Sequence, residues 1–264
     1  MSHASVVAVV NQKGGVGKTT TTVNLGTALA AAGQRVLIVD IDPQGNASTS
    51  LGLDYGQRGS GTYSLLLPQG PESRSRETIV PNMRILPSDT ELAGAEIELV
   101  GEHRREYRLA DGLAQHGFLE ASDIILLDCP PSLGLLTLNS LVAADLVLVP
   151  LQCEFFALEG ISQVLRTVER VRAGLNPRLQ LNGIVLTMFD RRNNLSELVA
   201  ADARSFFKSQ VYDTVIPRNV RVSEAPSHGK PVLLYDFRSP GAQAYVKLAQ
   251  EFLIRSRPIV KASA

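Results

Sequence analysis

Residues 11–20, Asn-Gln-Lys-Gly-Gly-Val-Gly-Lys-Thr-Thr, constrain the fold more than any other stretch of the chain. They follow a β-branched run at 6–10 and precede helical spacing of apolar residues, which Gly33 is placed to end. A strand, a glycine-rich turn and a helix form the setting of a phosphate-binding loop, because backbone N–H groups and the helix amino end attract phosphate. The pattern therefore predicts such a loop here.

Apolar runs elsewhere predict further buried strands that alternate with helical patterns. The predicted strands cover 36–39, 83–87, 124–127, 146–151, 184–189 and 212–216, and the predicted helices cover 88–99, a stretch from Leu158 to Val168 that Gly174 ends, 195–208 and 242–253. Such alternation implies crossover connections and a parallel sheet. We expect one α/β domain over 1–264, a mostly parallel twisted β-sheet with helices on both faces, and flexible tails at 1–5 and 256–264. Residues 51–81 predict surface loops and short helices.

Composition narrows the class of protein. The 264 residues are 44% hydrophobic, enough for a sizeable core, and 26 Lys and Arg balance 26 Asp and Glu. No overall positive field would therefore draw the chain onto nucleic acid, so any such binding must come from a local patch. Cys129 and Cys153 are too far apart for a CxxC motif, which fits a reducing cytoplasm. Residues 1–5 lack a signal-peptide pattern and no run is long enough to span a bilayer, so we expect a soluble, unprocessed, cytoplasmic protein.

Three aspartates follow predicted strands: Asp40, Asp42 and Asp128. In an open parallel sheet ligands bind beyond the carboxyl ends of the strands, where the glycine loop also lies. Lys18 would reach the β- and γ-phosphates, and Thr19, Asp42 and Asp128 are the candidates for holding Mg²⁺. Asp42 is also the candidate for orienting an attacking water, with Asp40 nearby. The alternative is that these aspartates only cap strands or helices.

The loop departs from the ordinary P-loop at one position, since Gln12 stands where that motif has glycine. Residues 13–19 instead resemble the deviant Walker A motif of the ParA/MinD class of P-loop ATPases, which carries an extra lysine. Three further blocks, at 39–46, 126–132 and 216–230, resemble those of ParA/Soj chromosome-partitioning ATPases. The resemblance runs from residue 6 to the final predicted helix.

The resemblance implies an ATP-dependent switch with ATP and Mg²⁺ as cofactors. Two subunits would sandwich two ATP molecules, and Lys13 of each would cross to the phosphates of the other. The catalytic candidates are Lys13, Lys18 and Asp42, and the nucleotide-binding candidates are Lys13, Gly14, Gly15, Val16, Gly17, Lys18, Thr19, Thr20, Met188, Pro217 and Asn219.

The resemblance also implies partners. The dimer would bind double-stranded DNA without sequence preference through Arg192, Arg221 and Lys230, in a nucleoid-associated state. A ParB-type centromere-binding protein would stimulate hydrolysis and so release the DNA. The chain begins without a long extension carrying its own helix-turn-helix, so operator-specific binding is not expected. The basic balance over 190–230 is only +2, seven against five, which also fits a solvated surface.

Three other classes remain open at this point. A membrane-bound ATPase of the MinD type would need a terminal amphipathic helix, whereas 242–253 has the spacing of a docked core helix. A carboxylate-activating ligase would need a substrate pocket that no motif supplies. A nitrogenase-type iron protein would need bridging cysteines, and Cys129 and Cys153 read better as small buried thiols. His103, His116 and His228 share no metal-ligand spacing, and the mixed-sign run at 102–106 predicts a solvated helix face.

Overall fold

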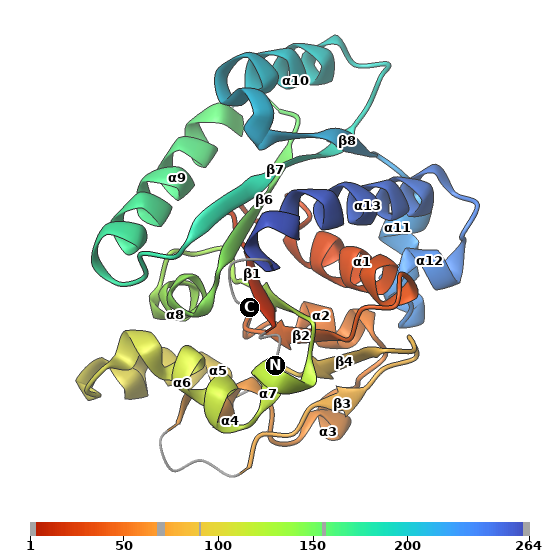
Figure 1. Cartoon of the computed structure of the whole chain (residues 1–264). Coiled ribbons are helices and arrows are strands. Elements are labelled where there is room, and N and C mark those ends of the chain that lie inside the picture. The colour runs from red at the N-terminus through yellow and green to blue at the C-terminus, as the bar shows by residue number, and fades with distance from the viewer. Residues whose placement is uncertain (1–3, 68–71, 90, 155–156, 261–264) are drawn as a thin grey trace.

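The computed structural model describes residues 4–67, 72–89, 91–154 and 157–260, with backbone alone at 157–159 and 257–260. A twisted sheet of eight strands in the order β3-β4-β2-β5-β1-β6-β7-β8 forms its centre (Figure 1). The strands are β1 (Ser5–Val9), β2 (Val36–Asp40), β3 (Arg76–Glu77), β4 (Met83–Leu86), β5 (Ile124–Asp128), β6 (Leu146–Gln152), β7 (Gln180–Phe189) and β8 (Val211–Pro217). All neighbours pair in parallel except β3 with β4, which confirms the predicted mostly parallel α/β fold.

Helices cover both faces of this sheet. The helices are α1 (Lys18–Ala31), α2 (Asn46–Ser50), α3 (Tyr55–Arg58), α4 (Thr62–Leu66), α5 (Leu92–Glu98), α6 (Arg108–Gln115), α7 (Phe118–Ala121), α8 (Leu135–Ala143), α9 (Ala157–Gly174), α10 (Asn194–Phe207), α11 (Val220–Glu224), α12 (Val232–Tyr235) and α13 (Pro240–Val260). Short 3-10 turns occur at Leu99–Gly101, Arg105–Tyr107, Lys208–Gln210 and Ala225–His228. Alternate residues of β1 enter separate cores: Val7 and Val9 pack with α1 and α13, and Val6 and Ala8 pack with α8 and α9.

Several predictions of element position differ from the structure. Helices α6 and α8 were not predicted. For α8 the reason is that it carries no charged residue and most of it is buried, so it lacks the polar face that reveals a helical period. Strand β7 begins at Gln180, earlier than the predicted start at 184, because Gln180 and Asn182 are polar and the first three residues are at least partly exposed. The predicted role of Leu158 in a helix face lies outside the described side chains.

Regular secondary structure extends into both of the predicted flexible tails. Strand β1 begins at Ser5, and the N–H of Ala4 donates to the carbonyl of Leu119 at 3.0 Å. Helix α13 continues to Val260, with Ser256 buried and accepting a hydrogen bond from Asn182. These contacts with residues distant in sequence involve parts of the chain that the sequence predicts to be flexible tails. The remaining parts of the predicted tails, 1–3 and 261–264, lie outside the described residues.

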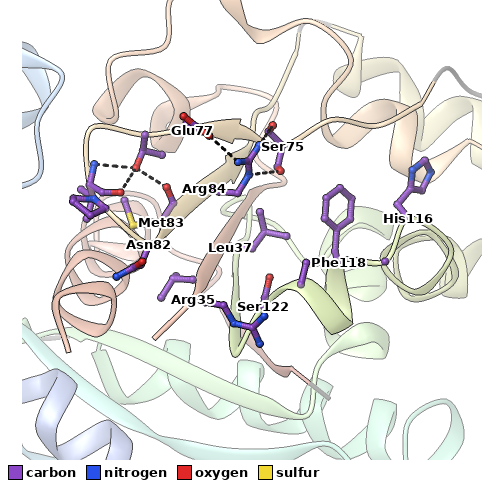
Figure 2. A pocket seen from close by; sticks show the side chains of 16 residues that line it. Arg35, Leu37, Ser75, Glu77, Asn82, Met83, Arg84, His116, Phe118 and Ser122 are labelled. Atoms are coloured by element: carbon purple, nitrogen blue, oxygen red, sulfur yellow. Dashed lines mark hydrogen bonds and ion pairs between the residues drawn. The ribbon is translucent and has the colours of Figure 1, made fainter. Parts of the chain in front are cut away.

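The amino ends of β2 and β4 border a cavity of about 470 Å³ (Figure 2). Val36, Leu37 and Met83 contribute apolar lining, and Phe118 contributes an aromatic ring. Arg84 at its rim is already engaged, since it donates to Ser75 and pairs with Glu77. The cavity lies at the strand ends opposite the glycine loop, and none of the predicted site residues lines it.

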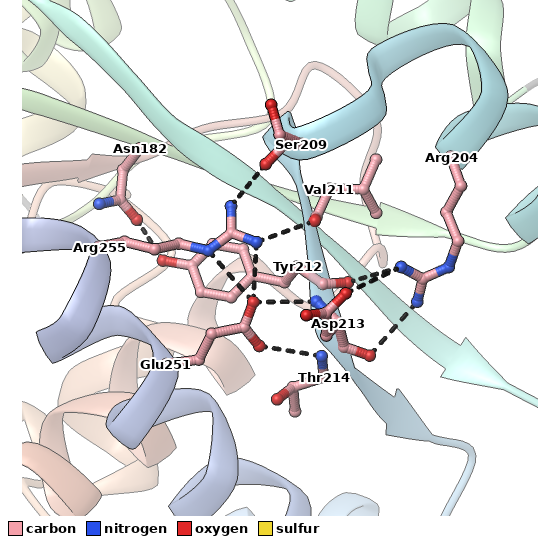
Figure 3. Close-up of polar contacts among 9 residues, drawn as sticks. All are labelled: Asn182, Arg204, Ser209, Val211, Tyr212, Asp213, Thr214, Glu251 and Arg255. Carbon is pink, nitrogen blue, oxygen red and sulfur yellow. Dashed lines mark hydrogen bonds and ion pairs between the residues drawn. The ribbon is translucent and has the colours of Figure 1, made fainter.

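The outer edge of β8 is covered by side chains instead of another strand (Figure 3). Glu251 of α13 accepts hydrogen bonds from the N–H groups of Asp213 (2.9 Å) and Thr214 (3.0 Å). Arg204 and Arg255 donate to the carbonyls of Tyr212, Asp213, Ser209 and Val211. An unpaired strand edge is a template for pairing with another chain, so these contacts satisfy the edge and block that pairing.

We predict that Glu251→Ala lowers the free energy of unfolding by about 2 kcal/mol, because two backbone N–H groups lose their acceptor. Urea denaturation followed by circular dichroism measures this change. Gln250→Ala, an exposed change on the same helix, should shift stability by less than about 0.5 kcal/mol. Equal effects of the two substitutions would contradict the capping role of Glu251.

The same contact predicts a pH dependence of stability. Burial raises the pKa of Glu251, but hydrogen bonds from Thr214 and Asp213, with Arg255 nearby, bring the pKa below its ordinary value of 4.5. A depressed carboxyl pKa contributes stability that is present above the ordinary value and is lost as pH falls through the folded-state value. The difference in stability between the wild type and Glu251→Ala should therefore shrink as the pH falls below about 4.5.

Candidate functional site

The glycine loop between β1 and α1 is anchored by buried side chains at both ends. Asn11 donates to the carbonyl of Pro150 (2.8 Å) and accepts from the N–H of Lys13 (3.0 Å). The hydroxyl of Thr187 on β7 donates to the carbonyl of Val16 (2.8 Å). Gly15 and Gly17 have φ values of +77° and +92°, a region that disfavours side chains, so glycine is required for this path.

Lys18 is the buried lysine of the loop. Its side chain lies in the first turn of α1, is 6% exposed, and donates to the carbonyl of Lys13 at 3.0 Å. Burial lowers the pKa of Lys18, and the nearby Asp128, Cys129 and Asp42 oppose that shift. The loop thus places an ammonium group among carboxylates beside the helix amino end, an arrangement suited to binding phosphate.

Asp40 and Asp128 lie side by side on β2 and β5, in register and fully buried. One oxygen of Asp128 accepts from the Thr22 hydroxyl (3.1 Å), and one oxygen of Asp40 accepts from the N–H and the hydroxyl of Ser48 (2.8 and 2.6 Å). Burial, followed by repulsion between the two, raises the pKa of Asp128; for Asp40, burial is again the main cause. Asp42, beyond the end of β2, accepts the N–H of Gln44 at 3.0 Å.

The chemistry of this edge fits a divalent cation. The second oxygen of Asp128 and the first oxygen of Asp40 are buried and have no hydrogen-bond partner among the described residues. Mg²⁺ prefers hard oxygen ligands and usually combines one or two protein oxygens with water and phosphate. Asp128, with Thr19 one residue beyond Lys18, therefore fits a magnesium site. Within the described residues no cluster of three or more His, Cys, Asp or Glu side chains forms a metal site by itself.

A cavity of about 200 Å³ opens beside the glycine loop, between α1 and the ends of β7 and β8. It brings Gly17 and Thr20 together with three residues distant in sequence, Met188, Pro217 and Asn219. Met188 has φ +51°, unusual for a side chain that is not glycine, and such backbone is common at functional sites. The cavity thus collects the residues expected at a nucleotide base.

Tyr245 also lines this cavity, although the sequence assigned it to the core. Its hydroxyl lies 3.5 Å from that of Thr21 on α1, and the side chain is almost completely buried. The helical pattern of 242–253 marked Tyr245 as an apolar position, and no signal in the sequence shows that its edge reaches the cavity. Arg218 and Ser223 also line the cavity, although the sequence did not mark them as nucleotide-site residues.

Lys13 differs from Lys18 in being exposed. Its ammonium group forms an ion pair with Glu154, which follows β6. Both partners remain partly exposed to solvent, so the pair contributes roughly 0–1 kcal/mol and can open readily. The two lysines of the loop thus have different environments within one subunit.

The structure divides the predicted DNA-binding residues between two places. Arg192 lines a cavity of about 850 Å³ together with Arg191, Arg218 and Lys247. Arg221 on α11 pairs with Glu224 (2.9 Å) and Asp236 (3.5 Å), while Lys230 is exposed beyond that helix. Lys247 was missed because the pattern of α13 indicated only a docked helix.

Both cysteines are free, buried thiols. Burial raises the pKa of Cys129 to about 12 and that of Cys153 to about 11, so neither is a ready thiolate ligand. A cluster shared between two subunits needs thiolates at a surface, so the geometry gives no support to an iron-protein reading.

The fold and the site define a P-loop NTPase with a deviant Walker A loop. A family model described as an AAA domain matches residues 4–181. The chain is 58% identical over 253 residues to the chromosome partitioning protein ParA of Caulobacter vibrioides, covering 96% of this chain and 95% of that protein. It is 51% identical over 247 residues to the sporulation initiation inhibitor protein Soj of Bacillus subtilis, covering 93% and 97%.

Among solved structures, the chain is similar to the crystal structure of cobyrinic acid a,c-diamide synthase from Mycobacterium smegmatis with bound ADP and magnesium. That likeness has a TM-score of 0.83 and 39% identity, and covers 97% of this chain and 96% of that one.

The identities to ParA and Soj show that the chain belongs to the ParA/Soj family of chromosome-partitioning ATPases. The predicted cofactors, ATP and Mg²⁺, agree with these comparisons. Among the described residues, no helix is long and apolar enough to cross a membrane.

Two glycines of similar backbone conformation test the phosphate loop. We predict that Gly17→Ala weakens ATP binding at least about tenfold, because strain at φ +92° moves the N–H groups that face phosphate. Gly33→Ala at the other end of α1 is the control. Its backbone strain at φ +89° is similar and its Cβ would meet no described atom within 4 Å, so it should cost similar stability but leave the affinity for ATP unchanged. Equilibrium binding of a fluorescent ATP analogue should separate the variants; equal affinities would contradict the loop assignment.

Proposed function

We propose that this ATPase is a DNA-segregation switch, in which an ATP-sandwich homodimer binds double-stranded DNA without sequence preference. Hydrolysis, stimulated by a ParB-type centromere-binding partner, then releases the DNA. The observation that carries the proposal is the difference between the two loop lysines: the Lys18 side chain is buried at its own loop, whereas the Lys13 side chain is half exposed and pairs with Glu154. A lysine in that position is free to serve a neighbouring subunit.

Within one subunit, the loop N–H groups and Lys18 bind and orient the phosphates. Thr19 and Asp128 are the residues that would hold Mg²⁺, with Asp42 close by, and a bound Mg²⁺ neutralises charge on the phosphate oxygens. The carboxylate of Asp42, fixed by the Gln44 N–H, accepts a hydrogen bond from the attacking water and aims it at the γ-phosphate. The cavity at Met188, Pro217 and Asn219 takes the adenine.

Lys13 supplies the charge that this subunit lacks. Phosphoryl transfer needs preorganised cations where negative charge develops, and a positive group supplied by a partner can serve that purpose. On dimerisation Lys13 leaves Glu154 and contacts the phosphates of the other subunit. Hydrolysis then depends on assembly.

DNA binding rests on local cations, since the chain has no net charge. Arg192 is highly exposed and paired with Asp190, and Arg221 is half exposed and paired with Glu224, so phosphate would compete with carboxylate at both. Arg191, Arg218 and Lys247 form no ion pair among the described residues and add to the surface around Arg192. Two subunits double the phosphate contacts, which steepens the salt dependence of binding.

The packing of the last helix argues against a membrane as the surface that is bound. Tyr245, Leu248, Ala249 and Phe252 of α13 are buried against the sheet and α1, so its apolar face is occupied. A membrane-binding helix would need that face free. The protein is accordingly proposed to be cytoplasmic and nucleoid-associated.

Lys13→Ala should retain ATP binding but lose ATP-dependent dimers, because the crossing charge is removed. Size-exclusion chromatography with light scattering, in ATP and Mg²⁺, measures the dimer. Glu154→Gln is the matched control, since it breaks the same ion pair while keeping Lys13, and it should still dimerise. A dimer peak that survives in Lys13→Ala refutes the crossing role.

Arg221→Ala should abolish DNA retention while ATP binding is unchanged, because a phosphate contact is lost from each subunit. Arg172→Ala on α9 is the matched control: it is equally exposed and forms the same i,i+3 ion pair, with Glu169. Binding isotherms on double-stranded DNA at low salt measure both. Unchanged DNA binding by Arg221→Ala would remove that residue from the interface.

The whole proposal is tested by ATP hydrolysis measured with DNA and with the basic amino-terminal peptide of a ParB-type protein, separately and together. We expect the two to stimulate hydrolysis synergistically. Hydrolysis that neither addition changes would contradict the partitioning switch.

A further inference from the structure

Arg58 is a buried arginine in the stretch that the sequence assigned to surface loops. It ends α3 and is 1% exposed, which is rare for an arginine. A guanidinium removed from water is stabilised only where its N–H groups find acceptors. The acceptors around Arg58 therefore show what the residue holds together.

Four hydrogen bonds tie the guanidinium to separate parts of the chain. Its nitrogens donate to the hydroxyl of Thr49 (2.8 Å) and to the carbonyls of Gly45, Leu53 and Ser88 (3.3 Å each). The ring of Tyr55 lies 4.0 Å from the guanidinium carbon. Gly45 closes the loop that carries Asp42, and Ser88 follows β4, so one side chain joins both segments.

Gly45 is shaped for this contact. It has φ +64°, and a Cβ atom at that position would lie 2.1 Å from a guanidinium nitrogen of Arg58. Its N–H donates to the carbonyl of Asp42 at 2.8 Å. Arg58 is thus in close contact with Gly45, the residue that closes the turn at Asp42.

The same group reaches Asp40 through a chain of contacts. The N–H of Ser88 donates to the hydroxyl of Ser48 (3.1 Å), and that hydroxyl donates to Asp40 (2.6 Å). The positive charge of Arg58 also lowers the pKa of Asp40, against the larger raising effect of burial. Arg58 therefore supports both Asp40, at the end of β2, and Asp42, two residues beyond it.

We propose that Arg58 is a positioning residue for ATP hydrolysis, holding the 40–45 loop from behind so that Asp42 keeps its orientation toward the attacking water. The inference rests on the proposed role of Asp42. Arg58 does not touch the phosphate loop in the described contacts, so its loss should affect turnover more than nucleotide binding.

The test compares Arg58→Met with Arg255→Met in the full chain. Both changes remove an arginine that donates to several backbone carbonyls, but the acceptors of Arg255 are Ser209 and Val211 at the β8 edge (Figure 3) and not residues of the 40–45 loop. Steady-state ATP hydrolysis is measured with saturating double-stranded DNA, at a temperature where circular dichroism shows every variant folded. We expect kcat to fall at least about tenfold for Arg58→Met with KM for ATP changed less than about twofold, and no such fall for Arg255→Met.

A conservative variant and a double-mutant cycle sharpen the result. Arg58→Lys keeps the buried charge and should recover part of the lost kcat. Gly45→Ala should lower kcat by displacing the guanidinium. The double variant Gly45→Ala with Arg58→Met should lose less activity than the two single losses added together, because both changes break the same contact. Strictly additive losses, or equal losses in Arg58→Met and Arg255→Met, would overturn the proposal.

The outcomes separate this inference from the proposed function. A wild-type protein that hydrolyses ATP but does not retain DNA would contradict the partitioning switch while leaving the comparison of turnover intact. A wild type that does both, with Arg58→Met turning over ATP normally, would overturn the role of Arg58 alone.

Discussion

Two carboxylates buried side by side at the end of a sheet cost free energy, and much of the surrounding chain offsets that cost. Asp40 and Asp128 each keep one oxygen satisfied by serine or threonine, and each leaves one buried oxygen without a described partner. Lys18 contributes buried positive charge from α1, and Arg58 contributes it from α3. The remaining imbalance suits a divalent cation and explains why a phosphate loop, two strand ends and a distant arginine converge here.

The loop assigns its two lysines unequal environments, and that inequality links the fold to assembly. Lys18 is held at its own loop by burial and by the hydrogen bond to the Lys13 carbonyl. Lys13 remains at the surface in an ion pair that solvent weakens, so moving it to another subunit costs little. Under the proposed function such a site is incomplete in one chain, and hydrolysis would then depend on a partner subunit.

Much of the fold followed from the sequence because parallel strands buried on both faces leave continuous β-branched runs, as at β1 and β2. The same logic failed at α8, whose buried, uncharged surface has no visible helical period. At the site, the glycine loop and the strand-end aspartates could be identified from the sequence pattern, while the assignment of Met188, Pro217 and Asn219 to nucleotide binding came from the family resemblance. Arg58 and Lys247 could not be found, because their meaning depends on which distant segments meet them.

Mixing two inactive variants tests whether Lys13 acts on the nucleotide of the other subunit. Lys13→Ala keeps Asp42, and Asp42→Ala keeps Lys13, so a mixed dimer contains one site with Lys18, Asp42 and a crossing Lys13. We predict that each variant alone hydrolyses ATP poorly and that the mixture, with DNA present, regains activity. A mixture no more active than the two variants measured separately would contradict a crossing Lys13, since a lysine acting within its own subunit cannot be restored in this way.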